Sequence, residues 1–218
     1  MRIELTTGTP AELSTPVGRD ATMGLVLWTD IWGLRTLFDE HGRRLAQEHG
    51  FVVCAPELYP GQESLGPDER HAVAAGFDDD VKLADALAAA DATGHERVGI
   101  LGFCMGGMYA LKAAGSGRFV RHVAFYGMPR VPAGWAGAGQ RDAIDLVAQG
   151  DPSSVLYLVG TDDPWCPSDD VDDLERLGVS VVRYPEADHA FAQDPSRETY
   201  RADDAADGWA RATAFLVS

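Results

Sequence analysis

The chain has 218 residues, of which 45% are hydrophobic, and this length and composition suit one α/β domain with a substantial core. We therefore expect a single domain over residues 1–218. Its 34 acidic residues against 18 basic ones give a net charge of −16, which argues against nucleic acid or an anionic membrane as a partner.

The cysteines and the first residues indicate where the protein resides. Three cysteines, an odd number, point to free thiols in a reducing compartment rather than to a disulfide framework. The first residues lack the apolar core of a signal peptide, and no segment reaches membrane-spanning length. We expect a cytoplasmic protein. No ligand spacing joins the cysteines to the six histidines, so we expect neither a metal nor a cofactor.

Strand-like and helical segments alternate along the chain without repeats or a dividing linker. Strands are predicted over 25–28, 51–55, 97–101, 120–126, 155–159 and 179–184, and helices over 34–48, 78–92, 108–114 and 202–216. Such alternation predicts a mostly parallel sheet covered on both faces. The segments 59–76 and 127–139 resist assignment, and long connections of this kind are often lids or substrate walls.

Helical spacing predicts which helix faces are buried. In the last helix, one stripe carries Trp209, Ala212 and Leu216. In the helix over 78–92, the residues expected to face the sheet are Val81, Ala84, Leu87 and Ala88. The acidic runs 78–80 and 169–173 are predicted to be solvated side chains at helix starts, where they complement the helix dipole.

The most informative segment is Gly-Phe-Cys-Met-Gly-Gly at 102–107, between a predicted strand and a predicted helix. A Gly-x-nucleophile-x-Gly turn in this context lifts its middle side chain above the sheet, and the glycines let the backbones approach closely. The start of a helix also favours the thiolate form of a cysteine. Cys104 is therefore the candidate nucleophile, against the alternative of a small buried cysteine in a glycine-rich turn.

A nucleophilic cysteine needs a base and a group that orients the base, and candidates follow in the chain. Asp162 and Asp163 come directly after the strand over 155–159, and His189 lies in the loop after the strand over 179–184. Nucleophile, acid and histidine in this order is the arrangement of α/β-hydrolases. The histidine would take up and return the proton while the acid holds its tautomer.

These features together resemble the dienelactone hydrolase family, a cysteine-nucleophile branch of the α/β-hydrolases. The resemblance runs from about Gly24 to the C-terminus and rests on five segments: 29–33, 54–59, the Cys104 turn, 160–167 and 184–191. It implies an α/β-hydrolase fold with a mostly parallel central sheet, and an enzyme that cleaves a small carboxylic ester or lactone without a cofactor.

The resemblance also implies roles for particular residues. Cys104 matches the nucleophile and His189 the base. Asp163 fits the family spacing of the acid, with the adjacent Asp162 as the alternative. The backbone N–H groups of Ile31 and Met105 would form the oxyanion hole, which stabilises the charge that develops on the carbonyl oxygen.

Two departures from the family pattern bear on the substrate. Asp30 stands where related enzymes carry a glutamate that helps to hold the resting thiol. Ala72 and Gln193 stand where those enzymes carry two arginines that grip a substrate carboxylate. Hydrolysis of dienelactone itself therefore does not follow, unless another cation such as Arg35 or Arg70 takes over that grip.

The remaining candidates have two readings each. Cys54 is predicted to be core, whereas Cys166 either fills an apolar slot or pairs with Cys104 under oxidation. Aromatic residues that either line the site or belong to the core are Trp32, Tyr59, Trp135 and Phe191. The sequence thus predicts a Cys-His-Asp hydrolase of a small ester or lactone; the alternative is a non-catalytic binding or thiol-sensing protein on the same fold.

Overall fold

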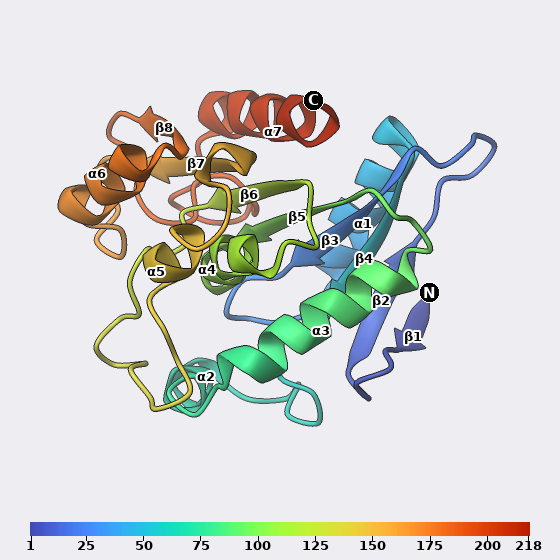
Figure 1. Ribbon diagram of the computed structural model, residues 1–218, viewed down its shortest axis with the longest axis horizontal. Coiled ribbons are helices and arrows are strands. Elements are labelled where there is room, and N and C mark those ends of the chain that lie inside the picture. The colour runs from blue at the N-terminus through green and yellow to red at the C-terminus, as the bar shows by residue number, and fades with distance from the viewer.

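One eight-stranded sheet organises the computed structural model, which describes all 218 residues (Figure 1). The strand order is β1-β2-β4-β3-β5-β6-β7-β8, with parallel pairing from β4 to β8 and antiparallel pairing of β2 to both β1 and β4. The strands are β1 (Arg2–Glu4), β2 (Pro10–Ser14), β3 (Met23–Trp28), β4 (Phe51–Pro56), β5 (Val98–Phe103), β6 (Arg121–Phe125), β7 (Val155–Gly160) and β8 (Ser180–Tyr184).

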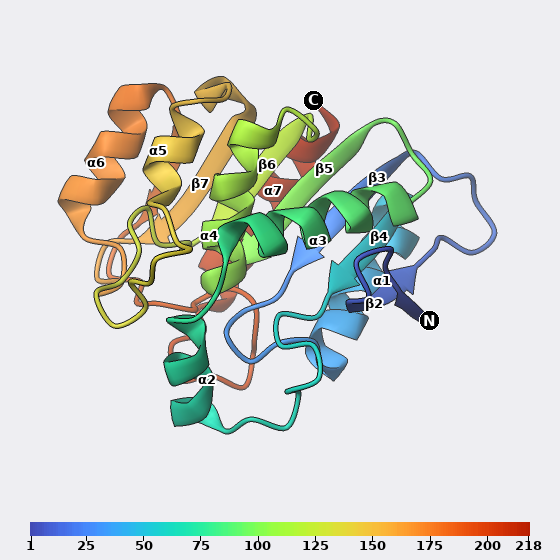
Figure 2. The same cartoon turned by 60° about the horizontal axis from the view of Figure 1, so that its bottom comes forward.

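Helices cover both faces of this sheet. Figure 2 shows α3 and α4 in front of the strands and α1 and α7 behind them. The α-helices are α1 (Thr36–His49), α2 (Pro67–Ala74), α3 (Asp79–Ala92), α4 (Met105–Lys112), α5 (Ala143–Val147), α6 (Ser168–Leu177) and α7 (Ala202–Val217). The predicted α/β-hydrolase fold with a mostly parallel sheet is confirmed. None of these helices combines the length and the apolar character that a membrane crossing requires.

Four of the predicted strands correspond to β3, β4, β5 and β7. Each is an apolar run that is buried along its whole length, as expected for strands covered on both faces. The sequence did not reveal β1 and β2, which form the antiparallel edge. Both are short and carry glutamates, and their side chains are only partly buried, so no clear alternation marks them. The short helices α2 and α5 fall in or beside the segments that resisted assignment.

The predicted sheet-facing side of α3 is wrong. Val81, Ala84 and Leu87 are exposed, and of the predicted residues only Ala88 is buried. The buried side instead carries three polar residues among alanines: Asp79, Lys82 and Asp85. Lys82 donates from Nζ to the Leu58 carbonyl at 2.7 Å, and Asp85 accepts from the hydroxyls of two threonines. Hydrogen-bonded polar groups and small side chains allow this helix to approach the sheet closely. A prediction from the helical spacing of apolar residues does not identify such a buried face.

Asp79 likewise differs from the prediction that it is a solvated residue. Its side chain is fully buried and lies 2.7 Å from Nζ of Lys112, which is fully buried as well. This ion pair joins the start of α3 to the end of α4, the helix that follows the candidate nucleophile. In α7 the predicted stripe is confirmed, since Ala212 and Leu216 are buried and Trp209 is half-buried.

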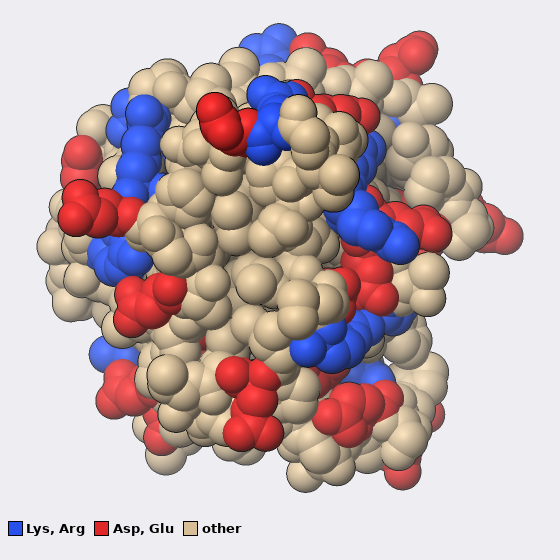
Figure 3. Space-filling model, turned by 90° about the vertical axis from the view of Figure 1, so that its right-hand side faces the viewer, with Lys and Arg blue, Asp and Glu red and all other residues tan.

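Acidic and basic side chains are interspersed on the face of the molecule drawn in Figure 3. Surface pairs such as Arg2 with Asp39 at 3.0 Å neutralise one another locally. On that face the charged side chains therefore form mixed-sign groups and do not gather into one negative patch.

Candidate active site

The turn between β5 and α4 holds Cys104 in a strained conformation. Its φ of 55° and ψ of −118° lie in a region that residues other than glycine rarely adopt. The turn is also closely packed: a Cβ on Gly102 would lie 2.1 Å from the Gly106 carbonyl oxygen, and one on Gly106 would lie 2.1 Å from the Thr29 oxygen. The glycines thus allow a turn that presents Cys104, which is 9% exposed, at the cavity described below.

His189 and Asp163 come together although 26 residues separate them. The Nδ1 atom of His189 lies 2.8 Å from Oδ2 of Asp163, whose side chain is fully buried. The other carboxylate oxygen of Asp163 accepts the backbone N–H of Trp165 at 2.9 Å. Asp162, by contrast, is exposed and accepts a hydrogen bond from the Thr161 hydroxyl. Of the two adjacent acids, only Asp163 is placed to orient the histidine.

The surroundings of His189 favour its charged form. Burial by itself lowers the pKa of this imidazole, but the negative charge of Cys104 and the hydrogen bonds to Asp163, Cys104 and Cys166 outweigh it. The pKa of His189 therefore lies well above its ordinary value.

Cys166 lies beside this pair but has a different character. It is buried, and burial raises the pKa of its thiol to about 11, which keeps it protonated near neutral pH. Ligand atoms of Asp163, Cys166 and His189 lie within 4.8 Å of one another, so these three side chains could hold a metal ion. Such an ion would have to displace the hydrogen bond that joins Asp163 to His189.

Two backbone N–H groups are free to stabilise an oxyanion near Cys104. The Ile31 amide donates to no acceptor within the protein. Met105 is the first residue of α4, and the first amides of a helix have no intrahelical acceptor. Because Ile31 follows β3 and Met105 follows β5, which pair side by side, both amides belong to the same edge of the sheet.

Asp30, the candidate to hold the Cys104 thiol in place of the family's glutamate, is engaged by several other groups. Its two carboxylate oxygens accept a bidentate contact from Arg35 at 2.6 and 2.9 Å. They also accept the backbone N–H of Trp32 at 3.0 Å and Nε2 of Gln193 at 3.2 Å. With its acceptor positions occupied in this way, buried Asp30 orders the loop that carries Ile31.

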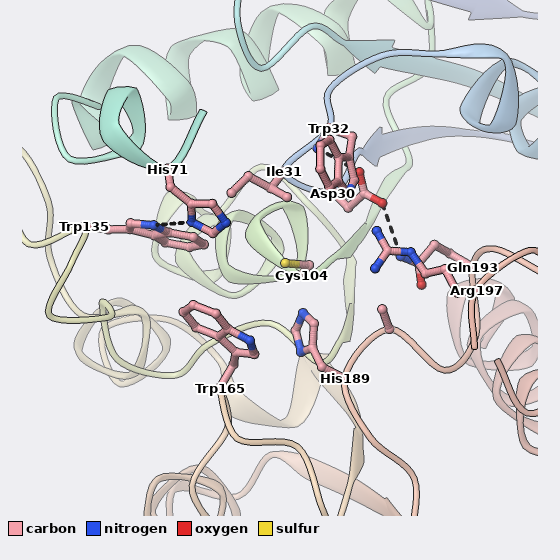
Figure 4. A pocket seen from close by; sticks show the side chains of 11 residues that line it. Asp30, Ile31, Trp32, His71, Cys104, Trp135, Trp165, His189, Gln193 and Arg197 are labelled. Atoms are coloured by element: carbon pink, nitrogen blue, oxygen red, sulfur yellow. Dashed lines mark hydrogen bonds between the residues drawn. The ribbon is translucent and has the colours of Figure 1, made fainter. Parts of the chain in front are cut away.

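A cavity of about 160 Å³ opens over Cys104 at the carboxyl ends of the central strands. Figure 4 shows His71, Trp135 and Trp165 on one side of Cys104. On the other side it shows the polar residues Asp30, Gln193 and Arg197 together with Trp32. The lining of the cavity consists of Asp30, Ile31, Trp32, His71, Cys104, Trp135, Trp165, His189, Ala190, Gln193 and Arg197.

Some of the predicted lining residues are absent from this cavity, and others were missed. Tyr59 and Phe191 belong to the core instead, because their neighbours cover them almost completely. Four lining residues escaped the sequence argument: His71, Trp165, Ala190 and Arg197. Trp165 follows Asp163 by two positions, a signal that could have been used, whereas His71 and Arg197 come from segments that no motif marked.

The two positions aligned with family arginines behave differently. Ala72 lines a separate groove and does not reach the cavity over Cys104. Gln193 does line the cavity, and its amide bridges Asp30 and the Tyr126 hydroxyl. Of the candidate replacement cations, Arg35 is committed to Asp30, and Arg70 donates to the carbonyls of residues 63 and 65. The cationic side chain that lines the cavity is Arg197.

Comparisons with known proteins identify the family of this chain. A family model described as the dienelactone hydrolase family matches residues 10–218. The carboxymethylenebutenolidase of Rhodococcus opacus is 28% identical over 217 residues, covering 88% of this chain and 79% of the relative. Protein usf of Aquifex pyrophilus is 26% identical over 213 residues, covering 88% and 87%.

A solved structure adds likeness at the level of the whole fold. The Klebsiella pneumoniae protein named "Putative Dienelactone Hydrolase" superposes with a TM-score of 0.87 at 26% identity, covering 100% of this chain and 98% of that one. Because the family model spans nearly the whole chain, this protein belongs to the dienelactone hydrolase family and is an ester or lactone hydrolase.

Proposed function

We propose that this protein hydrolyses a small carboxylic ester or lactone through a thioester formed on Cys104. The observation that carries the proposal is the strained turn that holds Cys104 in the same cavity as His189, a partly buried histidine bonded at 2.8 Å to buried Asp163. Nucleophile, base and orienting acid in mutual reach are what covalent acyl transfer requires.

In the first half of the reaction, the Cys104 thiolate attacks the carbonyl carbon of the substrate. The carbonyl oxygen becomes an oxyanion, which accepts hydrogen bonds from the Ile31 and Met105 amides. When this intermediate collapses, the bond between the carbonyl carbon and the ester oxygen breaks. The leaving oxygen takes the proton of His189, and the acyl group remains on sulfur as a thioester.

In the second half, water replaces the leaving group. Neutral His189 takes a proton from the water as it attacks the thioester carbonyl, and a second oxyanion forms in the same hole. Its collapse breaks the carbon–sulfur bond, releases the carboxylic acid and restores the thiolate and the charged histidine. Asp163 supports the imidazolium in each half without giving up its own charge.

The size and lining of the cavity support a small-molecule substrate. A cavity of about 160 Å³ accommodates a single ring or a short chain, and six of its eleven lining residues are hydrophobic. Arg197 supplies a cation at the polar side of the cavity. The two positions where related enzymes carry arginines hold Ala72 and Gln193 in this chain, so neither of them supplies a cation.

The test is to trap the acyl-enzyme. A chromogenic acetate ester is mixed with the protein, the reaction is quenched early, and intact-mass and peptide mass spectrometry locate the added acetyl group. We expect a burst of chromophore and acetylation at Cys104, with neither in Cys104→Ala. Turnover that survives in Cys104→Ala would refute the thioester mechanism.

A further inference from the structure

A buried glutamate lies beside the loop that carries Ile31, and no step of the proposed reaction uses it. Glu57 directly follows β4, which pairs in parallel with β3, so the segments after these two strands leave the sheet at the same edge. Glu57 is only 3% exposed and does not line the cavity over Cys104. A buried carboxylate is costly unless it is hydrogen-bonded, so the contacts of Glu57 show what keeps it in this position.

The two oxygens of Glu57 accept backbone N–H groups from two different segments. Oε2 accepts the Leu34 N–H at 3.0 Å, and Oε1 accepts the Tyr59 N–H at 2.8 Å. Leu34 lies three residues after Ile31, in the loop that follows β3. The Tyr59 hydroxyl donates to Sδ of Met105 at 3.8 Å. One carboxylate therefore connects the loop of the first proposed oxyanion donor to a side chain that contacts the second.

The turn that contains Ile31 leaves room for this carboxylate. The Gly33 N–H donates to the Asp30 carbonyl at 3.0 Å and closes the turn, and the Gly33 φ of 71° lies in the region that favours glycine. A Cβ on Gly33 would lie 2.5 Å from Oε1 of Glu57, which is closer than real Cβ contacts come. Glycine at this position therefore permits both the turn and the close approach of Glu57 to it.

The surroundings of Glu57 oppose its charge, and its hydrogen bonds compensate. Burial raises the pKa of this carboxyl above its usual value, although the N–H groups of Tyr59 and Leu34 and the nearby Arg70 guanidinium act in the opposite direction. Arg70 itself donates to the carbonyls of residues 63 and 65, so the hydrogen bonds to Glu57 come from the two backbone N–H groups. A carboxylate suits this position because it offers one acceptor oxygen to each of them.

We propose that Glu57 positions the oxyanion hole: its bond to the Leu34 N–H holds the loop after β3 so that the Ile31 N–H stays aimed at the reacting carbonyl oxygen. This role rests on the proposed acyl transfer, because the hole acts on the oxyanions of that reaction. The Ile31 amide has no acceptor within the protein, so the anchored residues on either side of it fix its direction. Asp30 anchors the loop before Ile31, and Glu57 anchors it after Ile31. A misplacement of about 1 Å in such a site can slow a reaction about a hundredfold.

Two substitutions of Glu57 remove these anchors stepwise. Glu57→Gln keeps the length of the side chain but has one acceptor oxygen, so one of the two backbone N–H groups then faces an amide N–H. Glu57→Leu accepts neither N–H. Acylation of Cys104 is followed by the burst of chromophore from an acetate ester at several ester concentrations. We expect the maximal acylation rate to fall about tenfold in Glu57→Gln and about a hundredfold in Glu57→Leu, with little change in the half-saturating ester concentration.

Alkylation of Cys104 by iodoacetamide measures the nucleophile without the hole. Sulfur displaces iodide from a saturated carbon, so a carbon–sulfur bond forms, the carbon–iodine bond breaks, and no oxyanion develops. We expect the rate of alkylation at Cys104, located by peptide mass spectrometry, to stay close to the wild-type rate in Glu57→Gln. A substitution that merely loosened the structure around Cys104 would change this rate as well.

Glu63→Gln is the matched control, because it removes the same charge from the same segment between β4 and α2. Glu63 is exposed, and its carboxylate accepts the Gly61 N–H at 2.9 Å rather than an N–H of the loop after β3. We expect its acylation and alkylation rates to equal those of wild type. Circular dichroism checks that each variant is folded, and Glu57→Gln decides the question if Glu57→Leu does not fold.

The outcomes distinguish the role of Glu57 from the proposed function. If wild type is acylated on Cys104 and Glu57→Gln is acylated equally fast, the hydrolysis stands and the role of Glu57 is wrong. The role is also wrong if acylation and alkylation slow down together in Glu57→Gln, because the substitution then acts on the nucleophile. If wild type is alkylated at Cys104 but never acylated there, the proposed mechanism fails and the role of Glu57 fails with it.

Discussion

Asp163→Asn tests the hydrogen bond on which the proposed mechanism depends. The carboxylate of Asp163 lies 2.8 Å from Nδ1 of His189 with its side chain fully buried, so solvent does not screen the contact. Asparagine has nearly the same shape but no charge. Its amide can also donate to Nδ1, which would place the histidine in the wrong tautomer.

The expected loss follows from these two effects. A hydrogen bond to a charged group contributes about 1.5–3 kcal/mol, and the wrong tautomer adds a further cost. A total of about 3–5 kcal/mol corresponds to a decrease in kcat of roughly 10²–10⁴-fold. The hydrogen bond to Asp163 is one of the interactions that raise the pKa of His189. We therefore also expect the pKa of His189 to be lower in Asp163→Asn than in wild type.

The assay compares wild type, Asp163→Asn and Asp162→Asn. Initial rates with a chromogenic ester are measured across pH, thiolate formation is followed by ultraviolet absorbance, and circular dichroism checks that each variant is folded. Asp162 is exposed, so its variant serves as the control and keeps nearly full activity. An equal or larger loss in Asp162→Asn, or a folded Asp163→Asn with wild-type rates, would refute the assignment of the acid.

The other predictions concern stability and specificity. Cys54 is buried, and burial raises the pKa of its thiol to about 12, so this thiol is not a nucleophile near neutral pH. Cys54→Ala should therefore leave ester turnover unchanged, whereas the small cavity that it creates should lower the free energy of unfolding by about 1 kcal/mol. Lys112→Met removes the buried cation from Asp79, which keeps only its contacts with Arg141, so chemical denaturation should show a loss of about 3–5 kcal/mol; a loss below about 1 kcal/mol would contradict the pairing. Burial lowers the pKa of His122 to about 4, so between about pH 6.5 and pH 4 the unfolded chain binds a proton that the folded chain does not. Stability should therefore decrease as the pH falls through this range, and less steeply in His122→Gln, as measured by urea unfolding at several pH values. Arg197→Gln should lower kcat/KM for a carboxylated ester about three- to tenfold relative to its neutral analogue, and an unchanged ratio would show that Arg197 does not bind the carboxylate.

The parts of the fold that could be predicted are those with a local signal. The central strands are continuous apolar runs, and the turn at Cys104 combines glycines with a nucleophile between a strand and a helix. The edge strands β1 and β2 and the buried face of α3 lacked such a signal. Lys82 and Asp85 are buried because a carbonyl and two hydroxyls from distant segments meet them, and no periodicity along α3 records those partners.

The same division applies to the site. Residue types and their order along the chain were enough to nominate Cys104, His189 and one of the adjacent acids Asp162 and Asp163, because this chemistry uses few side chains and the fold places them after particular strands. The resemblance to the family favoured Asp163. What the tertiary structure decided is how the surrounding side chains use their hydrogen bonds. Asp30 is occupied by Arg35 and Gln193, and the cavity walls come from α2 and from the loops that follow β3, β6, β7 and β8, which pack together only in the folded chain. Contacts between segments so far apart depend on how the whole sheet is assembled, so they follow from packing and not from any local pattern.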